Sequence, residues 1–155
     1  MTVQIGESIP QCSIQATTGL VFEPSSFLGK KLVLYFYPKD ATPGCTVEAG
    51  NFRDTIDEFT KANAVIVGVS RDSLKSHENF KSKHELPFEL VADVDEVLCS
   101  IFEVMKMKNM YGKQVRGLDR STFLFDSKGI LRHEWRGIKV PGHVEDVLKT
   151  VVAMS

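Results

Sequence analysis

The chain is poor in cysteine, with only Cys12, Cys45 and Cys99 among its 155 residues. An odd number of widely spaced cysteines argues against the disulfide framework of small secreted proteins and leaves free thiols. The sequence also lacks a CxxC pair, which excludes a thioredoxin-type redox pair and a paired-cysteine zinc site. His77 and His84 are further apart than the i, i+4 spacing of helical zinc ligands, so neither a metal nor another cofactor is expected.

No charge of one sign dominates, since the formal net charge is −1, and the overall balance gives no support to a nucleic-acid partner. No stretch approaches the roughly 18 apolar residues of a membrane span, and the start MTVQIGESIPQCS does not resemble a signal peptide. These features predict a cytoplasmic protein without a membrane partner. The length and the ordinary globular composition predict a single domain over residues 1–155.

Apolar and alternating stretches predict the strands. Residues 31–37 (KLVLYFY) and 64–70 (AVIVGVS) are almost wholly apolar or β-branched, as in strands that are covered on both faces. Residues 121–135 predict an antiparallel hairpin that turns at Gly129, and residues 11–22 predict a short hairpin around Gly19.

Helices are predicted between and after these strands, at residues 45–59, 73–84 and 93–103 and after Pro141-Gly142. The segment 102–117, rich in methionine and lysine, is expected to be a solvated loop, with an adaptable partner surface as the alternative. The order of elements predicts an α/β fold with a mixed central sheet flanked by helices. This pattern is similar to the thioredoxin fold with an N-terminal hairpin extension.

Cys45 occupies a chemically favourable place in this pattern. It follows Thr42-Pro43-Gly44, in which Thr42 suits the N-cap of a helix and Pro43 its first position. Cys45 would then lie in the first turn, where free N–H groups and the helix dipole favour an anion such as a thiolate. Because a helix terminus contributes only about 0.3–1 kcal/mol, an activated thiolate would need a further cation from elsewhere in the chain.

The segment around Cys45 resembles the active site of the peroxiredoxins, whose motif matches Pro38, Thr42 and Cys45. Longer strings are similar to the bacterioferritin comigratory protein (peroxiredoxin Q) branch: YPKDATPGCTVEAGNFRD, VIVGVSRDSLKSHENF, MYGKQVRGLDRSTFLFD and VPGHVEDVLK. The resemblance extends over nearly the whole chain. It implies a thioredoxin-like fold and an enzyme that reduces hydrogen peroxide and organic hydroperoxides.

The resemblance also implies a role for each matching residue. Cys45 would be the peroxidatic nucleophile, which becomes a sulfenic acid. Thr42 would hydrogen-bond the thiolate and the peroxide, and Pro38 would shield the pocket from water. Arg120, in the string DRSTF, would be the missing cation, since its planar fork can hold both sulfur and peroxide oxygen. Glu48 matches the branch as a supporting residue.

Each of these residues also has a plainer interpretation. A lone cysteine on an apolar helix face is usually an inert core residue. Thr42 could be only a cap, Pro38 only a strand terminator and Arg120 only a surface charge. Their joint occurrence in the motif favours the peroxidase.

The chain lacks a resolving cysteine at both of the places where members of the branch carry one. Gly50 stands five residues after Cys45, and residues 73–84 contain no cysteine. The sequence therefore favours a one-cysteine mechanism. Cys99, in an apolar helix, is the candidate for a resolving thiol, although a buried core thiol is the commoner role. Cys12 could be exposed, but nothing in the sequence directs it towards Cys45.

Gly50 would also weaken its helix by roughly 0.5–1 kcal/mol relative to alanine. In the family, the first turn of this helix unwinds to expose the oxidised sulfur, and a weaker helix could ease that opening. The alternative is that Gly50 is a neutral replacement for a lost cysteine.

The expected partners are a peroxide and an external thiol reductant, namely thioredoxin, glutaredoxin or glutathione. The resemblance favours a monomer, with a weak or disulfide-linked dimer as the alternative. Two other kinds of function are a thiol-disulfide oxidoreductase, against which the absence of CxxC argues, and a non-enzymatic redox sensor, relay or holdase. A sensor would begin from the same sulfenic acid, so the sequence does not separate it from a peroxidase.

Overall fold

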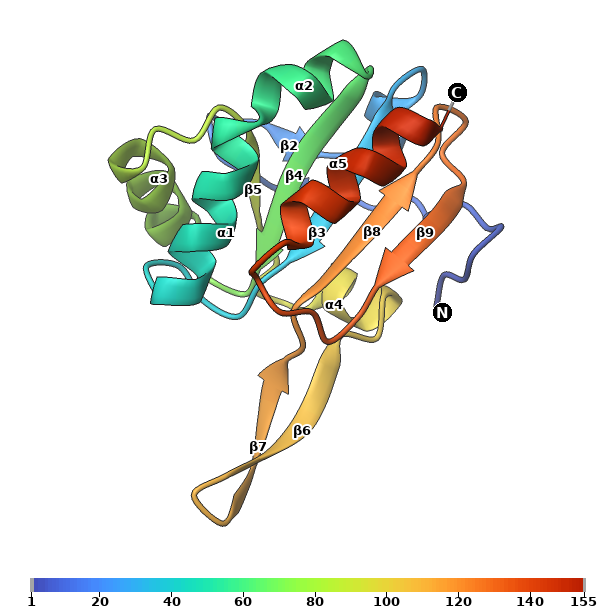
Figure 1. The fold of residues 1–155 in the computed structure, drawn as a ribbon. Helices are drawn as coiled ribbons and strands as arrows, with labels where there is room; N and C mark the ends of the chain where they lie inside the picture. Colours follow the sequence, from blue (N-terminus) through green and yellow to red (C-terminus); the bar gives the residue numbers. More distant parts are fainter. Residues whose placement is uncertain (1, 155) are drawn as a thin grey trace.

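A computed structural model describes residues 2–154 of the chain, and its centre is a five-stranded sheet (Figure 1). The strands of the sheet are β3 (Lys31–Phe36), β4 (Ala64–Ser70), β5 (Glu89–Ala92), β8 (Ser121–Phe125) and β9 (Leu131–Trp135). Their order is β5-β4-β3-β8-β9. The β3–β4 and β4–β5 pairs are parallel, whereas the β3–β8 and β8–β9 pairs are antiparallel. The prediction of a mixed central sheet is confirmed.

The central strand β3 is buried on both faces, which is why its sequence does not alternate between polar and apolar residues. Successive side chains of a strand point to opposite faces. Val33 and Tyr35 therefore pack in one core layer, while Leu34 and Phe36 pack in the other.

Helices cover both faces of the sheet, as predicted. Their bounds are α1 Pro43–Asp54, α2 Ile56–Lys61, α3 Leu74–Lys83, α4 Val97–Ile101 and α5 His143–Ala153, with a 3-10 helix η1 at Pro24–Phe27. Helices α1, α2, α3 and α5 contribute buried side chains to the layer that contains Tyr35. Helix α4 and the N-terminal segment cover the opposite layer. No helix in the described part of the chain has the length and apolar character needed to cross a bilayer.

Two predicted helices differ from the observed ones. The helix predicted over residues 45–59 is divided into α1 and α2 at Thr55, whose hydroxyl donates a hydrogen bond back to the Asn51 carbonyl over 2.8 Å. Such a bond is known to bend helices. The helix predicted over residues 93–103 is only α4, because Glu96 takes a left-handed conformation, with a φ of 57°, directly before it. The Asp93 carboxylate accepts hydrogen bonds from the N–H groups of Leu98 and Cys99.

Two predictions concern segments outside the central sheet, and only the first of them is confirmed. The N-terminal hairpin is confirmed, as β1 (Ile14–Gln15) paired with β2 (Val21–Phe22). The prediction of a solvated loop over residues 102–117 is wrong. Strands β6 (Met105–Met110) and β7 (Lys113–Leu118) form an antiparallel ribbon there, which extends away from the sheet (Figure 1). The alternating methionines and lysines of β6 have the period of a strand.

Candidate active site

Cys45 lies in the first turn of α1, just beyond the end of the central strand β3. The helix begins at Pro43 with Thr42 as its N-cap residue, as the sequence predicted. The Cys45 side chain packs in the layer that contains Tyr35 and is 1% exposed. The free N–H groups of the first helical turn favour an anion at this end of the helix.

Arg120 is the cation that an activated thiolate at Cys45 requires. It directly precedes β8, which is hydrogen-bonded to β3, so the sheet brings it to the start of α1. Its Nη2 donates a hydrogen bond to Cys45 Sγ over 3.4 Å, and its Nη1 donates one to Glu48 Oε1 over 2.6 Å. The guanidinium therefore joins the sulfur to a carboxylate one helical turn further on.

Gly44 provides room for this guanidinium. A Cβ atom at Gly44 would lie 3.2 Å from Arg120 Nη2, closer than ordinary van der Waals contact. The glycine of the Thr42-Pro43-Gly44-Cys45 string is thus explained by the close approach of Arg120.

Glu48 is completely buried, and its electrostatics reflect two opposing effects. Burial raises the pKa of Glu48 from 4.5 to about 7, against the attraction and hydrogen bond of Arg120, which lower it. Glu48 Oε2 has no hydrogen-bond partner among the described residues, so a proton on Oε2 would leave Oε1 free to accept from Arg120. Burial lowers the pKa of Arg120, but electrostatic attraction and hydrogen bonds to Glu48 and Cys45 outweigh it and the net pKa is raised.

Thr42 and Pro38 lie on the segment that joins β3 to α1. The Thr42 hydroxyl donates a hydrogen bond to the Lys39 carbonyl over 2.8 Å, so its oxygen retains lone pairs that can accept another bond. Pro38 is half-buried at the start of the segment. The structure thus brings Cys45, Glu48 and Arg120 into direct contact, and the roles predicted for Thr42 and Pro38 stay predictions.

The other two cysteines lie away from this site. Cys99 is fully buried on α4, in the core layer on the opposite side of the sheet from Cys45, and the half-buried Cys12 packs against that same layer. Burial raises the pKa of the Cys99 thiol well above its usual value, and Asp93 raises it further. A thiol in such surroundings is a poor nucleophile.

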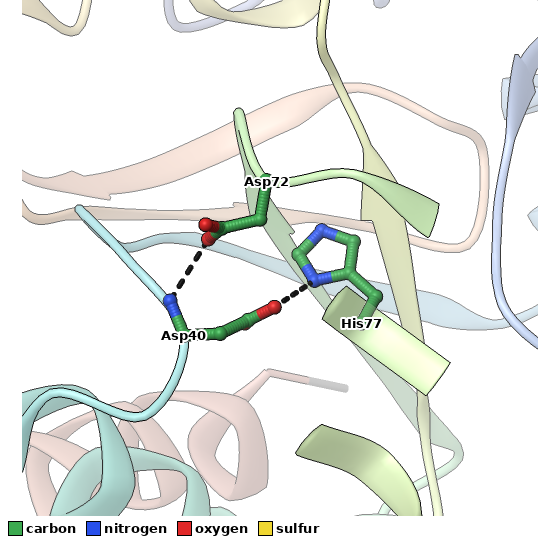
Figure 2. Close-up of side chains that lie close together, drawn as sticks. All are labelled: Asp40, Asp72 and His77. Carbon is green, nitrogen blue, oxygen red and sulfur yellow. Dashed lines mark hydrogen bonds and ion pairs between the residues drawn. The ribbon is translucent and has the colours of Figure 1, made fainter. Parts of the chain in front are cut away.

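Buried Asp40, on the segment before α1, forms a polar cluster with half-buried Asp72 and buried His77, and no sequence pattern indicates this cluster (Figure 2). Asp40 and His77 are 37 residues apart and no local pattern connects them. The ligand atoms of the three residues lie within 4.8 Å of one another, as in a metal site. However, both Asp40 oxygens and both His77 nitrogens already have hydrogen-bond partners in the protein, so the cluster fits a hydrogen-bond network better than a metal site.

The fold defines the class of protein, as comparison with solved structures makes clear. The chain superposes on peroxiredoxin Q of Xanthomonas campestris with a TM-score of 0.91 and 46% identity, covering 98% of this chain and 96% of that one. It is equally similar, with a TM-score of 0.91 and 46% identity over 97% and 96% of the two chains, to the bacterioferritin comigratory protein of that organism, studied for alkyl peroxide reduction. The thioredoxin-like fold is confirmed, and the protein is a thiol-dependent peroxidase.

Sequence comparisons place the chain within this class. The profile of the AhpC/TSA family matches residues 5–134. Peroxiredoxin Bcp of Bacillus subtilis is 47% identical over 155 residues, covering 100% of this chain and 99% of that protein. The chain belongs to the AhpC/TSA family, in the peroxiredoxin Q (Bcp) branch that its motifs indicated.

Proposed function

We propose that Cys45 is the peroxidatic nucleophile of this peroxidase and that its substrates are hydrogen peroxide and organic hydroperoxides, including alkyl peroxides. The thiolate sulfur attacks the terminal oxygen of the hydroperoxide and the O–O bond breaks. Cys45 becomes a sulfenic acid, and the departing alkoxide or hydroxide takes up a proton to leave as alcohol or water. The observation that carries the proposal is the guanidinium of Arg120, which donates to Cys45 Sγ and to Glu48.

Arg120 stabilises the charge that moves from sulfur to the departing oxygen. Its charge persists at any relevant pH, and Glu48 fixes the orientation of the guanidinium. In this proposal Thr42 accepts a hydrogen bond from the incoming hydroperoxide at the start of α1, and Pro38 limits the access of water. Both lie on the segment that leads from β3 into the helix.

We further propose a one-cysteine cycle that an external thiol completes. The location of Cys12 and Cys99 in the core layer opposite Cys45 supports this, as does Gly50 at the position of a resolving cysteine. Two external thiols would reduce the sulfenic acid, forming one disulfide and one water and restoring the Cys45 thiol. Thioredoxin, glutaredoxin and glutathione are the candidate reductants, and the working unit is a monomer.

Mass spectrometry after one equivalent of hydrogen peroxide tests the proposal. The reduced protein and its Cys45→Ser, Cys99→Ser and Cys12→Ser variants are oxidised, treated with a sulfenic-acid reagent and analysed as intact chains and peptides. We expect a sulfenic acid at Cys45 in every protein except Cys45→Ser. An internal disulfide from Cys45 to Cys99 or Cys12 would replace the one-cysteine cycle with a two-cysteine one, and no oxidation at Cys45 would contradict its catalytic role.

The main alternative, a redox sensor or relay, differs from a peroxidase in turnover. Peroxide consumption is followed with each candidate reductant supplied in excess. A peroxidase consumes many equivalents of peroxide per chain, whereas a sensor stops after one equivalent and transfers its oxidation to a partner.

A further inference from the structure

We infer that His77 is a positioning residue for Cys45, because through Asp40 it holds residues 38–42 in the conformation that presents Thr42 and Cys45 to the peroxide. The inference rests on the proposed role of Cys45 as the nucleophile. It assigns a part in the architecture of the active site to α3, which carries no residue of the peroxiredoxin motif but places His77 against Asp40 (Figure 2).

Asp40 is the fixed point of the segment between β3 and α1. Its Oδ1 accepts a hydrogen bond from the Tyr37 hydroxyl over 2.6 Å. Its Oδ2 accepts from His77 Nδ1 over 2.7 Å and from the Ser76 hydroxyl over 2.8 Å. Its backbone N–H donates to Asp72 Oδ2 over 2.8 Å. The main chain and side chain of Asp40 are thus both held, two residues before the N-cap of the catalytic helix.

Both ring nitrogens of His77 have partners in the protein. Nε2 lies 2.9 Å from the Val91 carbonyl oxygen, which only accepts, and Nδ1 faces the Asp40 carboxylate. Burial raises the pKa of Asp40, but hydrogen bonds from His77, Tyr37 and Ser76 outweigh it and the net pKa is lowered. A buried histidine–carboxylate pair therefore joins α3 to the segment before α1, with β5 on the far side of the ring.

The segment has a conformation that needs such support. Ala41 has a φ of 63°, in the left-handed region that is unfavourable for residues with a Cβ atom, and it is exposed. Such a conformation persists only where its neighbours determine it. Asp40 is held before Ala41, and after it the Thr42 hydroxyl closes the turn on the Lys39 carbonyl. Release of Asp40 would free the turn and move Thr42 and the first turn of α1 relative to Arg120.

Two substitutions of His77 separate its two hydrogen bonds. His77→Asn retains an amide nitrogen near the position of Nδ1, which can still donate to Asp40, whereas His77→Gln retains one near Nε2, which donates only to Val91. We expect His77→Gln to slow the oxidation of Cys45 by about tenfold or more, as small misplacements of reacting groups do. His77→Asn should recover most of that loss.

Two further variants control for lost stability and for a failure of His77→Gln to fold. Val147→Ala removes core packing from α5 in the same layer and reports the effect of lost stability alone. Ser76→Ala removes a second, partly exposed donor to Asp40 and should slow oxidation by a few-fold even if His77→Gln does not fold. The rates come from stopped-flow mixing of each reduced protein with hydrogen peroxide, and the urea midpoints from parallel unfolding curves.

The outcomes distinguish this inference from the proposed function. If wild-type Cys45 does not react with peroxide, the proposed function fails. The positioning role of His77 is overturned if wild-type Cys45 reacts while His77→Gln loses no more rate than Val147→Ala does at a comparable urea midpoint. It is overturned equally if His77→Asn and His77→Gln lose the same rate, or if Ser76→Ala reacts as fast as wild type.

Discussion

Cys45 and Cys99 lie in different core layers, separated by the central sheet. Cys45 lies in the same core layer as Tyr35 of β3, whereas Cys99 lies in the layer of Phe36, the next residue of the same strand, which points to the opposite face. A disulfide requires Cα atoms within about 7 Å, so an internal bridge between these thiols would require the sheet or α1 to come apart. This arrangement is the structural argument for an external thiol.

Cys99 should be chemically inert in the folded protein. Because burial and Asp93 raise the pKa of its thiol and the side chain is fully buried, iodoacetamide at pH 8 should alkylate Cys99 at least about tenfold more slowly in the folded chain than in urea. Peptide mass spectrometry over time measures both rates, and the half-buried Cys12 is the internal comparison. Equal rates for Cys99 in the two states would contradict its burial.

Arg120 should not be replaceable by lysine. Arg120→Lys keeps a positive charge but loses the fork that reaches Cys45 Sγ and Glu48 Oε1 together, so the rate of Cys45 oxidation should fall roughly a hundredfold. Stopped-flow measurement with hydrogen peroxide gives the rate. Arg132→Lys, on a half-exposed arginine paired with Asp126, is the matched control and should react like wild type. A small effect of Arg120→Lys would mean that charge alone is sufficient.

Glu48 should make the stability of the reduced protein depend on pH. Its pKa rises from 4.5 to about 7 on folding, so the folded state binds the proton more tightly than the unfolded state does. The resulting stabilisation is present below pH 4.5 and is lost as the pH rises through about 7. The free energy of unfolding of wild type minus that of Glu48→Gln should therefore decrease from pH 5 to pH 8, measured by urea unfolding. A constant or increasing difference would show that Glu48 is ionised throughout.

Gly44 should be intolerant of alanine although alanine favours helices. A methyl group at Gly44 would press on Arg120 Nη2, whose position is fixed by Cys45 and Glu48, so Gly44→Ala should slow the oxidation of Cys45 severalfold. The measurement is again stopped-flow oxidation by peroxide. An undiminished rate of Cys45 oxidation would show that the guanidinium can shift without slowing the reaction.

Gly50→Ala makes the same chemical change in the same helix with a different expected result. The nearest atom to the new methyl group is Arg53 Nη2 at 3.5 Å, an ordinary contact. Alanine should therefore raise the free energy of unfolding by roughly 0.5–1 kcal/mol and leave the oxidation of Cys45 unchanged. If α1 must loosen for the sulfenic acid to meet its reductant, reduction should become slower. Unchanged reduction kinetics would show that Gly50 does not ease the loosening of α1.

The helices and strands that the sequence predicts correctly are those whose pattern lies in residues close together in the chain. The apolar runs of β3 and β4 and the Thr42-Pro43 start of α1 were all located from local pattern. The predictions that failed involved competition between local and distant contacts. Thr55 divides a continuous apolar helix face by bonding to the Asn51 carbonyl, and β6 gains its strand conformation only by pairing with β7.

The sequence by itself determined the family, the place of Cys45 at the start of a helix and the requirement for a cation beside it. Periodicity, capping and a short motif carry this information, because they act between residues that are close in the chain. Only the tertiary structure decided which groups surround the sulfur. Arg120 reaches Cys45 across 75 residues, and His77 reaches Asp40 across 37. The order of strands in the sheet created both contacts, and the alternation of side chains along β3 put Cys99 on the other side.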